Sequence, residues 1–461
     1  MDIDDRRATR AAILSLAWPV MIANFLQTFT TFVDLLMVGH LGAEEGVVAV
    51  SAVGAAQQVL FLNFALMFAL SAGTLAVVAR SLGAKDPVAA SHAAKQALLL
   101  GVVLSLPLAA IEFAFAEPIL AGITANRLTS DFIPAASAYL RILLLVNPFQ
   151  FLLFLSTTVL QAAKDTRTPM YVGAAVNVVN FVLNFPLIYG LGPFPRYGVA
   201  GAAIGTAVST AIGASVLVLL LWRGRAGIKL PRGGGFDLGM VRRILRVGGP
   251  AGLESLLFQV GLTVWLAMVA TLGTTAYAAH TIGLRVQSLA FMPGIGFARA
   301  ASTLVGQNLG AKAPAEAERS GLEASKLSVL VMCSIGLFNF LAAPWIAAAF
   351  TPSTVTQDLT VLFIRIHALS IPAVGLYFAL DGALKGAGDT RFPLLTSVVG
   401  IFAVRLPLAF ALGFVVIAAG APWWVPLGLT GVWFALPVEY YIRLVMISSR
   451  FRAGRWKAAR V

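Results

Sequence analysis

Long apolar stretches alternate with short charged segments along the whole chain. Each stretch holds about 20 to 30 mostly apolar residues, enough for a helix to cross the roughly 30 Å hydrocarbon layer of a bilayer. The pattern predicts twelve membrane-spanning helices, near 12–40, 48–79, 94–116, 132–162, 169–192, 198–222, 244–272, 276–307, 321–349, 356–384, 392–418 and 425–449. The predicted fold class is therefore an all-α polytopic membrane protein.

The second half of the chain repeats the first. The motif Leu-Gly-Ala-Lys at 82–85 recurs at 309–312, and Asp-Thr-Arg at 165–167 recurs at 389–391. The prolines Pro19, Pro148 and Pro186 match Pro250, Pro372 and Pro407 in the same order. Six spans per repeat give both halves the same orientation in the membrane. We therefore predict two pseudo-symmetric six-helix lobes, 1–223 and 244–461, joined by a cytoplasmic linker at 224–243.

Composition and charge placement support a membrane location. The 461 residues are 59% hydrophobic and 11% charged, whereas a soluble domain carries roughly 25% charged residues. Lys and Arg cluster in alternate loops, and the opposite loops hold little beyond Arg127 and Arg196. The positive-inside rule then predicts a bacterial-type inner membrane protein with both termini cytoplasmic. The net charge of +13 thus reflects topology, and no nucleic-acid partner is expected.

Few residues suit metal, redox or nucleotide chemistry. Cys333 is the only cysteine, which excludes an intramolecular disulfide and a cysteine metal cluster. The four histidines are scattered, and no G-x-x-x-x-G-K-[ST] motif occurs. We expect no cofactor, no enzymatic activity and no obligate protein partner, so the chain is expected to act as a monomer. The charged N-terminal segment lacks a small-residue cleavage site, so no signal peptide is expected.

Two polar stripes occur inside predicted spans of the first half. Helical spacing places each stripe on one face of its helix, with Asn24, Gln27, Thr28, Thr31 and Asp34 in the first span and Asn177, Asn180 and Asn184 in the fifth. Such groups tie helices together through hydrogen bonds, or they line a wet cavity. A carboxylate facing amides there could hold a proton or coordinate Na⁺.

The repeat allows an internal comparison of these positions. Counting from the matched prolines, Asp34 corresponds to Trp265 and Asn184 corresponds to Arg405. The second half therefore lacks the carboxylate and amide set of the first half. We assign cation coupling to the first half.

Other ionisable residues within spans have simpler explanations. Asp381 precedes Lys385 by four residues and Glu439 precedes Arg443 by four, so each pair is expected to neutralise itself. Glu112, near the outer end of the third span, is expected to reach water. Glu254 is either a cavity carboxylate or the partner of a cytoplasmic-side arginine. The acidic partners of three further bases within spans cannot be assigned from sequence, namely Arg285, Arg299 and Arg405.

With these residues in place, the chain resembles the MATE (multidrug and toxic compound extrusion) family over nearly its full length. The resemblance rests on Pro19, Val-Asp-Leu-Leu-Met-Val-Gly at 33–39, Gly-Ala-Lys at 83–85, Val-Gly-Gln-Asn-Leu-Gly-Ala at 305–311 and Ala-Gly-Asp-Thr-Arg at 387–391. It implies a V-shaped pair of six-helix lobes that exports amphipathic, often cationic, compounds by alternating access in exchange for Na⁺ or H⁺.

The resemblance also implies roles for particular residues. The acid of the family's first helix matches Asp34, and its fifth-helix and sixth-helix residues match Asn180, Asn184 and Thr206, with an amide replacing an acid at Asn184. Gln259 stands where the NorM-like branch has a glutamate, which favours a DinF-like arrangement. The amide in place of the acid at Asn184 weakens a Na⁺ site and favours H⁺ coupling. For the substrate cavity we expect Asn24, Gln27, Thr31, Asn177, Glu254, Gln259 and Gln287.

The residues leave three alternatives to drug export open. A flippase for lipid-linked precursors needs several bases to hold a pyrophosphate, which keeps Arg285, Arg299 and Arg405 of interest. An integral-membrane enzyme needs clustered His, Asp or Glu near one membrane face, and the scattered histidines count against it. A passive channel does not need a polar stripe confined to one half.

Overall fold

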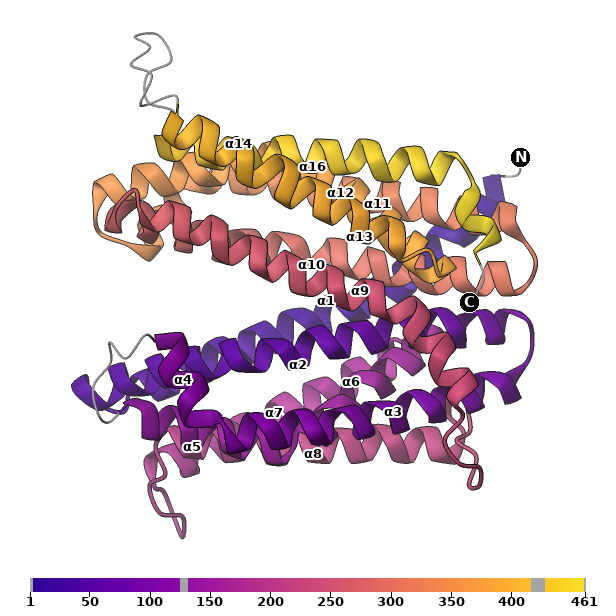
Figure 1. The fold of residues 1–461 in the computed structure, drawn as a ribbon, viewed down its shortest axis with the longest axis horizontal. Coiled ribbons are helices and arrows are strands. Elements are labelled where there is room, and N and C mark those ends of the chain that lie inside the picture. Colours follow the sequence, from indigo (N-terminus) through magenta and orange to yellow (C-terminus); the bar gives the residue numbers. More distant parts are fainter. Residues whose placement is uncertain (1–2, 125–131, 416–427, 460–461) are drawn as a thin grey trace. The chain divides into compact units, whose positions relative to one another are not determined.

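The computed structural model describes residues 3–124, 132–415 and 428–459, and within these ranges the chain is helical without β-strands (Figure 1). The first half comprises α1 (Ile3–Gly39), α2 (Ala43–Gly83), α3 (Pro87–Ala114), α4 (Ala116–Thr124), α5 (Phe132–Leu145), α6 (Asn147–Ala162), α7 (Arg167–Tyr189) and α8 (Val199–Arg223). After the short η1 (Arg225–Gly227), the second half comprises α9 (Leu238–Ala270), α10 (Thr274–Gly310), α11 (Pro314–Phe350), α12 (Thr354–Ala387), α13 (Arg391–Val398), η2 (Val399–Arg405), α14 (Leu406–Phe410), η3 (Ala411–Val415), α16 (Gly428–Arg452) and η4 (Arg455–Ala458).

The predicted all-α membrane fold is confirmed, and each predicted span falls on described helices. Ten helical stretches are long and apolar enough to cross a membrane, and α13 to η3 together form one of them. Among the described residues, α16 is not one of these ten stretches. The predicted span end at 418, the span start at 425 and Arg127 lie outside the described residues.

The fourth predicted span is broken where the sequence suggested one continuous helix. Its two parts, α5 and α6, meet at an angle of 54°. Pro148 stands at the start of α6, where it has no N–H to continue the helical ladder and its ring crowds the preceding turn. The matching Pro372 lies inside the continuous helix α12, so the same residue breaks the helix in one half only.

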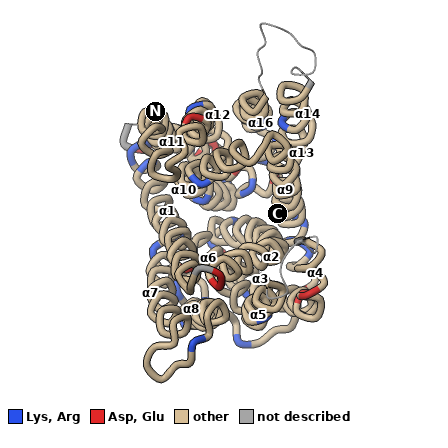
Figure 2. Tube along the Cα trace, turned by 90° about the vertical axis from the view of Figure 1, so that its left-hand side faces the viewer, with Lys and Arg blue, Asp and Glu red and all other residues tan. Residues whose placement is uncertain are grey.

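Charged side chains are sparse along the helices. Figure 2 shows long uncharged stretches of the trace between the positions of Lys, Arg, Asp and Glu. A helix satisfies its own backbone hydrogen bonds, which is what allows such stretches to lie in hydrocarbon.

The repeated loop motifs fold into repeated helix ends. Lys85 and Lys312 both take left-handed backbone conformations, with φ values of 59° and 58°. In the turns that follow α6 and α12, Lys164 has a φ of 64° and Gly388 has a φ of 89°. In each of these turns two backbone N–H groups bond back to the last helical turn, as in a Schellman motif. The duplicated sequence therefore encodes duplicated helix termini.

The Asp-Thr-Arg motif anchors the end of each half. Asp165 accepts bonds from the Thr168 backbone N–H at 3.0 Å and from Arg225 Nε at 3.0 Å. Partial burial by itself would raise the pKa of Asp165, but these hydrogen bonds and the arginine charge outweigh it and hold the pKa below its ordinary value. In the second half, Arg450 Nε bonds Asp389 at 2.8 Å. The motif thus has an architectural role in both halves.

The described chain divides into two compact units whose boundaries differ from the predicted ones. One unit comprises Ile22–Gly252, and the other comprises Met1–Met21 with Leu253–Val461. The changes of unit fall just after Pro19 and Pro250, inside the long helices α1 and α9. The start of α1 belongs with the second-half helices, where Arg10 Nε lies 2.6 Å from Glu323. The start of α9 packs on α2, where a side chain added at Gly248 would overlap the Ala69 carbonyl.

We expect Lys164→Gly to raise the thermal unfolding midpoint in detergent. A left-handed conformation costs a non-glycine residue about 1–2 kcal/mol, and glycine avoids this cost. Glycine also loses more backbone entropy on folding, which offsets part of the gain. The net gain should be up to about 1 kcal/mol. The reciprocal change Gly388→Ala in the second half should lower the midpoint, and equal midpoints for all three proteins would contradict this account.

Candidate functional site

A chain of hydrogen bonds joins three helices of the first half at membrane depth. Asn184 Nδ2 on α7 donates to Asp34 Oδ1 on α1 at 2.7 Å and to Asn180 Oδ1 at 3.1 Å. Asn180 Nδ2 in turn donates to Thr206 Oγ1 on α8 at 3.0 Å. The four residues to which cation coupling was assigned therefore lie in one cluster. Their role in coupling remains a prediction.

The cluster combines buried amides with a more accessible carboxylate. Asn180 and Asn184 are almost wholly buried, at 4% and 0% exposure, while Asp34 and Thr206 are half-buried. Asp34 forms no salt bridge within the described residues. Its charge is therefore met by an amide alone, which leaves the carboxylate free to exchange a proton or bind a small cation.

Glycines of α8 allow this geometry. A Cβ built at Gly205 would overlap Asn184 Oδ1, and one built at Gly201 would lie 2.5 Å from the Leu187 carbonyl. Two glycines four residues apart let the backbones of α7 and α8 approach closely. Our sequence analysis did not assign a role to Gly205, although the Gly-x-x-x-Gly spacing signals close helix packing.

The predicted cavity residues of the first half lie on two of these helices, α1 and α7. Asn24 and Asn177 are half-buried, and Gln27 and Thr31 are exposed. Thr31 Oγ1 bonds the Gln27 carbonyl at 3.0 Å on its own helix. These side chains are thus accessible polar groups of α1 and α7, without a side-chain bond to the Asp34 cluster among those that the structure shows.

The predicted cavity residues of the second half lie in a different environment. Gln259 on α9 is half-buried, and Gln287 on α10 is buried beside Asn339 and His367. Glu254 belongs to a buried ion network, in which Oε2 lies 2.9 Å from Lys385 Nζ and Oε1 accepts a bond from Ser397 at 2.8 Å. Of the two interpretations of Glu254, the structure favours pairing with a base, but the near base is Lys385 and the expected kind of partner, an arginine, is Arg443 at 4.0 Å.

The ion network of the second half contains matched numbers of acids and bases. The predicted pairs are confirmed, with 2.8 Å between Lys385 and Asp381 and 3.1 Å between Arg443 and Glu439. Arg405, whose partner the sequence did not reveal, pairs with Glu439, and both are almost fully buried. Three carboxylates and three bases thus neutralise each other across α9, α12, η2 and α16. The arrangement indicates a structural brace.

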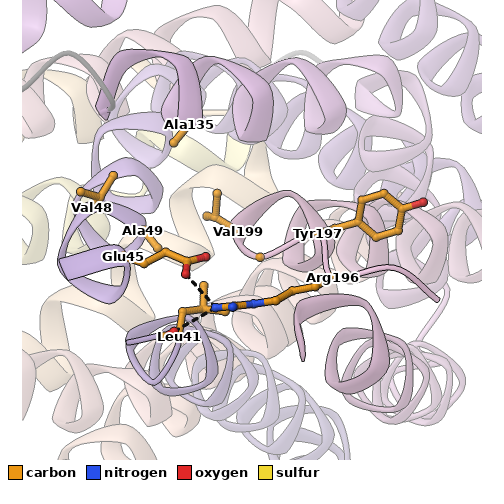
Figure 3. A pocket seen from close by; sticks show the side chains of 9 residues that line it. Leu41, Glu45, Val48, Ala49, Ala135, Arg196, Tyr197 and Val199 are labelled. Carbon is orange, nitrogen blue, oxygen red and sulfur yellow. Dashed lines mark hydrogen bonds and ion pairs between the residues drawn. The ribbon is translucent and has the colours of Figure 1, made fainter. Parts of the chain in front are cut away.

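A cavity of about 290 Å³ lies just beyond the ends of α1 and α7, among residues of α2, α5 and the α7–α8 connection. Figure 3 shows the Arg196 side chain reaching from the α7–α8 connection to Glu45 and to the backbone of Leu41. The two bonds measure 2.7 Å to Glu45 Oε2 and 3.0 Å to the Leu41 carbonyl. No predicted site residue lines this cavity. The hydrogen bonds of Arg196 tie the α7–α8 connection to the end of α1 and the start of α2.

Two related halves of membrane-spanning helices, with a polar cluster at membrane depth in one of them, define the class of helical membrane proteins to which secondary transporters belong. A family model described as MatE matches residues 19–186 and 250–411, one segment in each half. The chain therefore belongs to the MatE family, as the resemblance predicted.

Individual relatives are similar to this protein along nearly the whole chain. A probable multidrug resistance protein NorM of Thermotoga maritima is 28% identical over 97% of this chain and 93% of the relative. The protein of the same description from Deinococcus radiodurans is 30% identical over 96% of both chains. A solved structure described as the outward-facing conformation of a multidrug resistance MATE family transporter superposes with a TM-score of 0.86, at 22% identity and 97% coverage of both chains. This last similarity establishes the fold alone.

We expect Gly205→Ala to disturb the Asp34 cluster, because the added methyl group displaces Asn184. Overpacking of this kind typically costs about 1–3 kcal/mol, so the thermal unfolding midpoint should fall. The matched control is Gly173→Ala in α7, where nothing lies within 4 Å of the added Cβ. If both variants unfold at the same temperature, the close approach of α7 and α8 is not limiting.

We expect Glu439→Gln to destabilise the protein strongly, because it leaves Arg405 buried with an uncompensated charge. Breaking a buried ion pair costs about 3–5 kcal/mol, whereas an exposed pair is worth about 0–1 kcal/mol. Glu318→Gln is the control, since it breaks the more exposed Glu318–Lys457 pair. Comparable midpoint shifts in detergent for both variants would contradict a bracing role.

Proposed function

We propose that this protein is a secondary antiporter that exports amphipathic, often cationic, compounds in exchange for protons. Membership of the MatE family supports transport, and relatives across nearly the full length are described as multidrug resistance proteins. The observation that carries the coupling mechanism is the Asp34 cluster. It places one carboxyl group, without a basic partner in the described residues, against a buried amide.

The polarity of that contact favours a proton over Na⁺. Asn184 presents an N–H to Asp34, and its nitrogen is defined by two acceptors, since the same group also faces Asn180 Oδ1. A bound metal cation needs several oxygen ligands, and here a donor occupies one of the positions nearest the carboxylate. A proton needs only a carboxylate oxygen. We infer that Asp34 carries the coupled proton and that Na⁺ is the second candidate.

The proposed cycle follows alternating access. Protonation of Asp34 removes its charge and weakens the bond from Asn184, so the packing of α1 against α7 differs between the two protonation states. Proton and substrate need not share a site, because each needs only to prefer a different conformation. The accessible polar groups Asn24, Gln27, Thr31 and Asn177 are proposed to line the substrate path in the first half.

The remaining features of the proposal concern topology and assembly. The distribution of Lys and Arg supports an inner membrane location with both termini in the cytoplasm. We propose a monomer without a cofactor or an enzymatic activity. Gln259, in place of a glutamate, supports the DinF-like arrangement, which remains a proposal.

A lipid-linked precursor flippase is less well supported. That function needs several uncompensated bases for a pyrophosphate, but Arg405 is neutralised by Glu439 in the buried network. Arg285 is exposed and Arg299 is half-buried on α10. The flippase therefore loses one of the three bases on which it depended.

The test is substrate efflux from proteoliposomes driven by an imposed pH gradient. We expect Asp34→Asn to lower the initial rate by about tenfold or more, because the amide cannot carry the proton that couples the two conformations. The wild type should respond to a pH gradient without Na⁺ and not to a Na⁺ gradient at constant pH.

The control is Asp358→Asn, which removes an exposed carboxylate at the start of α12 and should leave the rate unchanged. Wild-type efflux by folded Asp34→Asn protein would refute the assignment of coupling to Asp34. Efflux driven by Na⁺ alone would refute proton coupling while leaving antiport intact.

A further inference from the structure

A second carboxyl group of the first half is buried away from Asp34. Glu112 lies on α3, two residues before the helix ends at Ala114. From its position it was expected to reach water, but this expectation is wrong, because only 4% of the residue is exposed. The neighbouring helices cover it, and it is not part of the Asp34 cluster.

Two amides from different helices face this carboxyl group. Asn63 Nδ2 on α2 donates to Glu112 Oε2 at 2.7 Å, and Asn147 Nδ2 at the start of α6 donates to Asn63 Oδ1 at 2.7 Å. Both amides are essentially inaccessible, at 1% and 0% exposure. Two acceptor atoms of this trio, Glu112 Oε1 and Asn147 Oδ1, are buried without a hydrogen-bond partner.

The ionisable groups on the packed helices do not compensate a charge on Glu112. On α5, Arg141 reaches the carbonyl next to Glu112, that of Phe113, at 3.4 Å, but its salt bridge at 3.3 Å is with Glu117 of α4. Arg141 is 38% exposed, so water also screens it. No salt bridge of Glu112 occurs in the part of the chain that the structure describes.

The other ionisable residues of these elements lie elsewhere or are neutral. On α2, Glu44 and Glu45 are in the first turn, where Glu45 pairs with Arg196, and Arg80 is in the last turn. His92 and Lys95 are near the start of α3, far along the helix from Glu112. Tyr139 on α5 is a neutral phenol at ordinary pH, and α6 has no ionisable side chain.

The fold itself does not need this trio. By the offset between Leu82 and Leu309, Glu112 corresponds to Asn339 and Asn63 corresponds to Ala290. By the match of Pro148 with Pro372, Asn147 corresponds to Ile371. The second half forms the matching helices α10 and α11 without this carboxyl group and the Asn63 amide, and its α12 is continuous where α5 and α6 are broken at Asn147. The trio therefore belongs to features that are particular to the first half.

Protonation of Glu112 removes the buried charge and supplies the trio with a further hydrogen-bond donor. An ionised carboxylate buried without a cation is very costly, and such groups neutralise themselves instead. Protonation at Oε1 turns this unpartnered acceptor into an O–H donor, and Asn147 Oδ1 remains in the same cluster as an acceptor without a partner. We propose that Glu112, with Asn63 and Asn147, forms a second proton-binding site of the first half, which takes up and releases its proton near the end of α3.

This site deepens the proposed antiport, since the proposed orientation places the end of α3 at the outer surface. The existence of the proton site does not depend on transport, so it can be tested separately. The break between α5 and α6 positions Asn147, and a carboxyl group bonded through Asn63 to that break can link protonation to the angle of the broken span.

The experiment is infrared difference spectroscopy of the protein in lipid across a pH titration, in an Asp34→Asn background that removes the carboxyl group of the Asp34 cluster. We expect a carbonyl-stretch band of a protonated carboxyl group that disappears as the pH rises. Glu112→Gln should abolish the band, and selective ¹³C labelling of glutamate should shift it in the unmutated Glu112 protein. The label keeps the test valid if Glu112→Gln fails to fold.

Two controls separate proton binding from a structural role. Asn63→Leu should change the frequency of the band, because it removes the hydrogen bond to the carboxyl group, whereas Glu117→Gln should leave the band unchanged. Titration spectra without a glutamate band, or with a Glu112 band that is independent of pH, overturn the proposal. A change at Glu112 on adding Na⁺ at constant pH also overturns it, in favour of a metal cation.

Discussion

The absence of water from the hydrocarbon layer is the constraint on which the structure depends. It forces the backbone into helices, which bond their own N–H and C=O groups, and it makes each polar side chain at membrane depth find a partner. The two halves meet this demand differently. The second half balances three buried acids with three bases, whereas Asp34 and Glu112 of the first half are held by amides.

This difference explains how one duplicated scaffold can serve two purposes. A carboxylate paired with arginine or lysine is held in its charged form. A carboxyl group held only by amides can change its charge at small structural cost, and its hydrogen bonds change with it. The first half is therefore suited to respond to protons, and the second half is suited to remain rigid.

The duplication is most exact where backbone geometry matters and least exact inside the helices. The left-handed residues Lys85 and Lys312 and the anchoring pairs of Asp165 with Arg225 and Asp389 with Arg450 recur in both halves. These features fix how one helix ends and the next begins. The side chains within the helices diverge because helix formation in a membrane places few demands on them beyond apolarity.

The sequence by itself determined the order and the approximate positions of the spans, because a run of apolar residues and its flanking charges are local properties. It also placed Asp34, Asn180 and Asn184 on single helical faces and predicted the pairs Asp381–Lys385 and Glu439–Arg443, because helical spacing brings such residues together. Only the tertiary structure decided which faces meet. It joined Asp34 to Asn184 across α1 and α7, paired Arg405 with Glu439 and buried Glu112, because contacts between helices depend on packing partners far apart in sequence. It also broke the fourth span at Pro148 and left α12 continuous at Pro372, since a proline's effect on a helix depends on the neighbours that surround it.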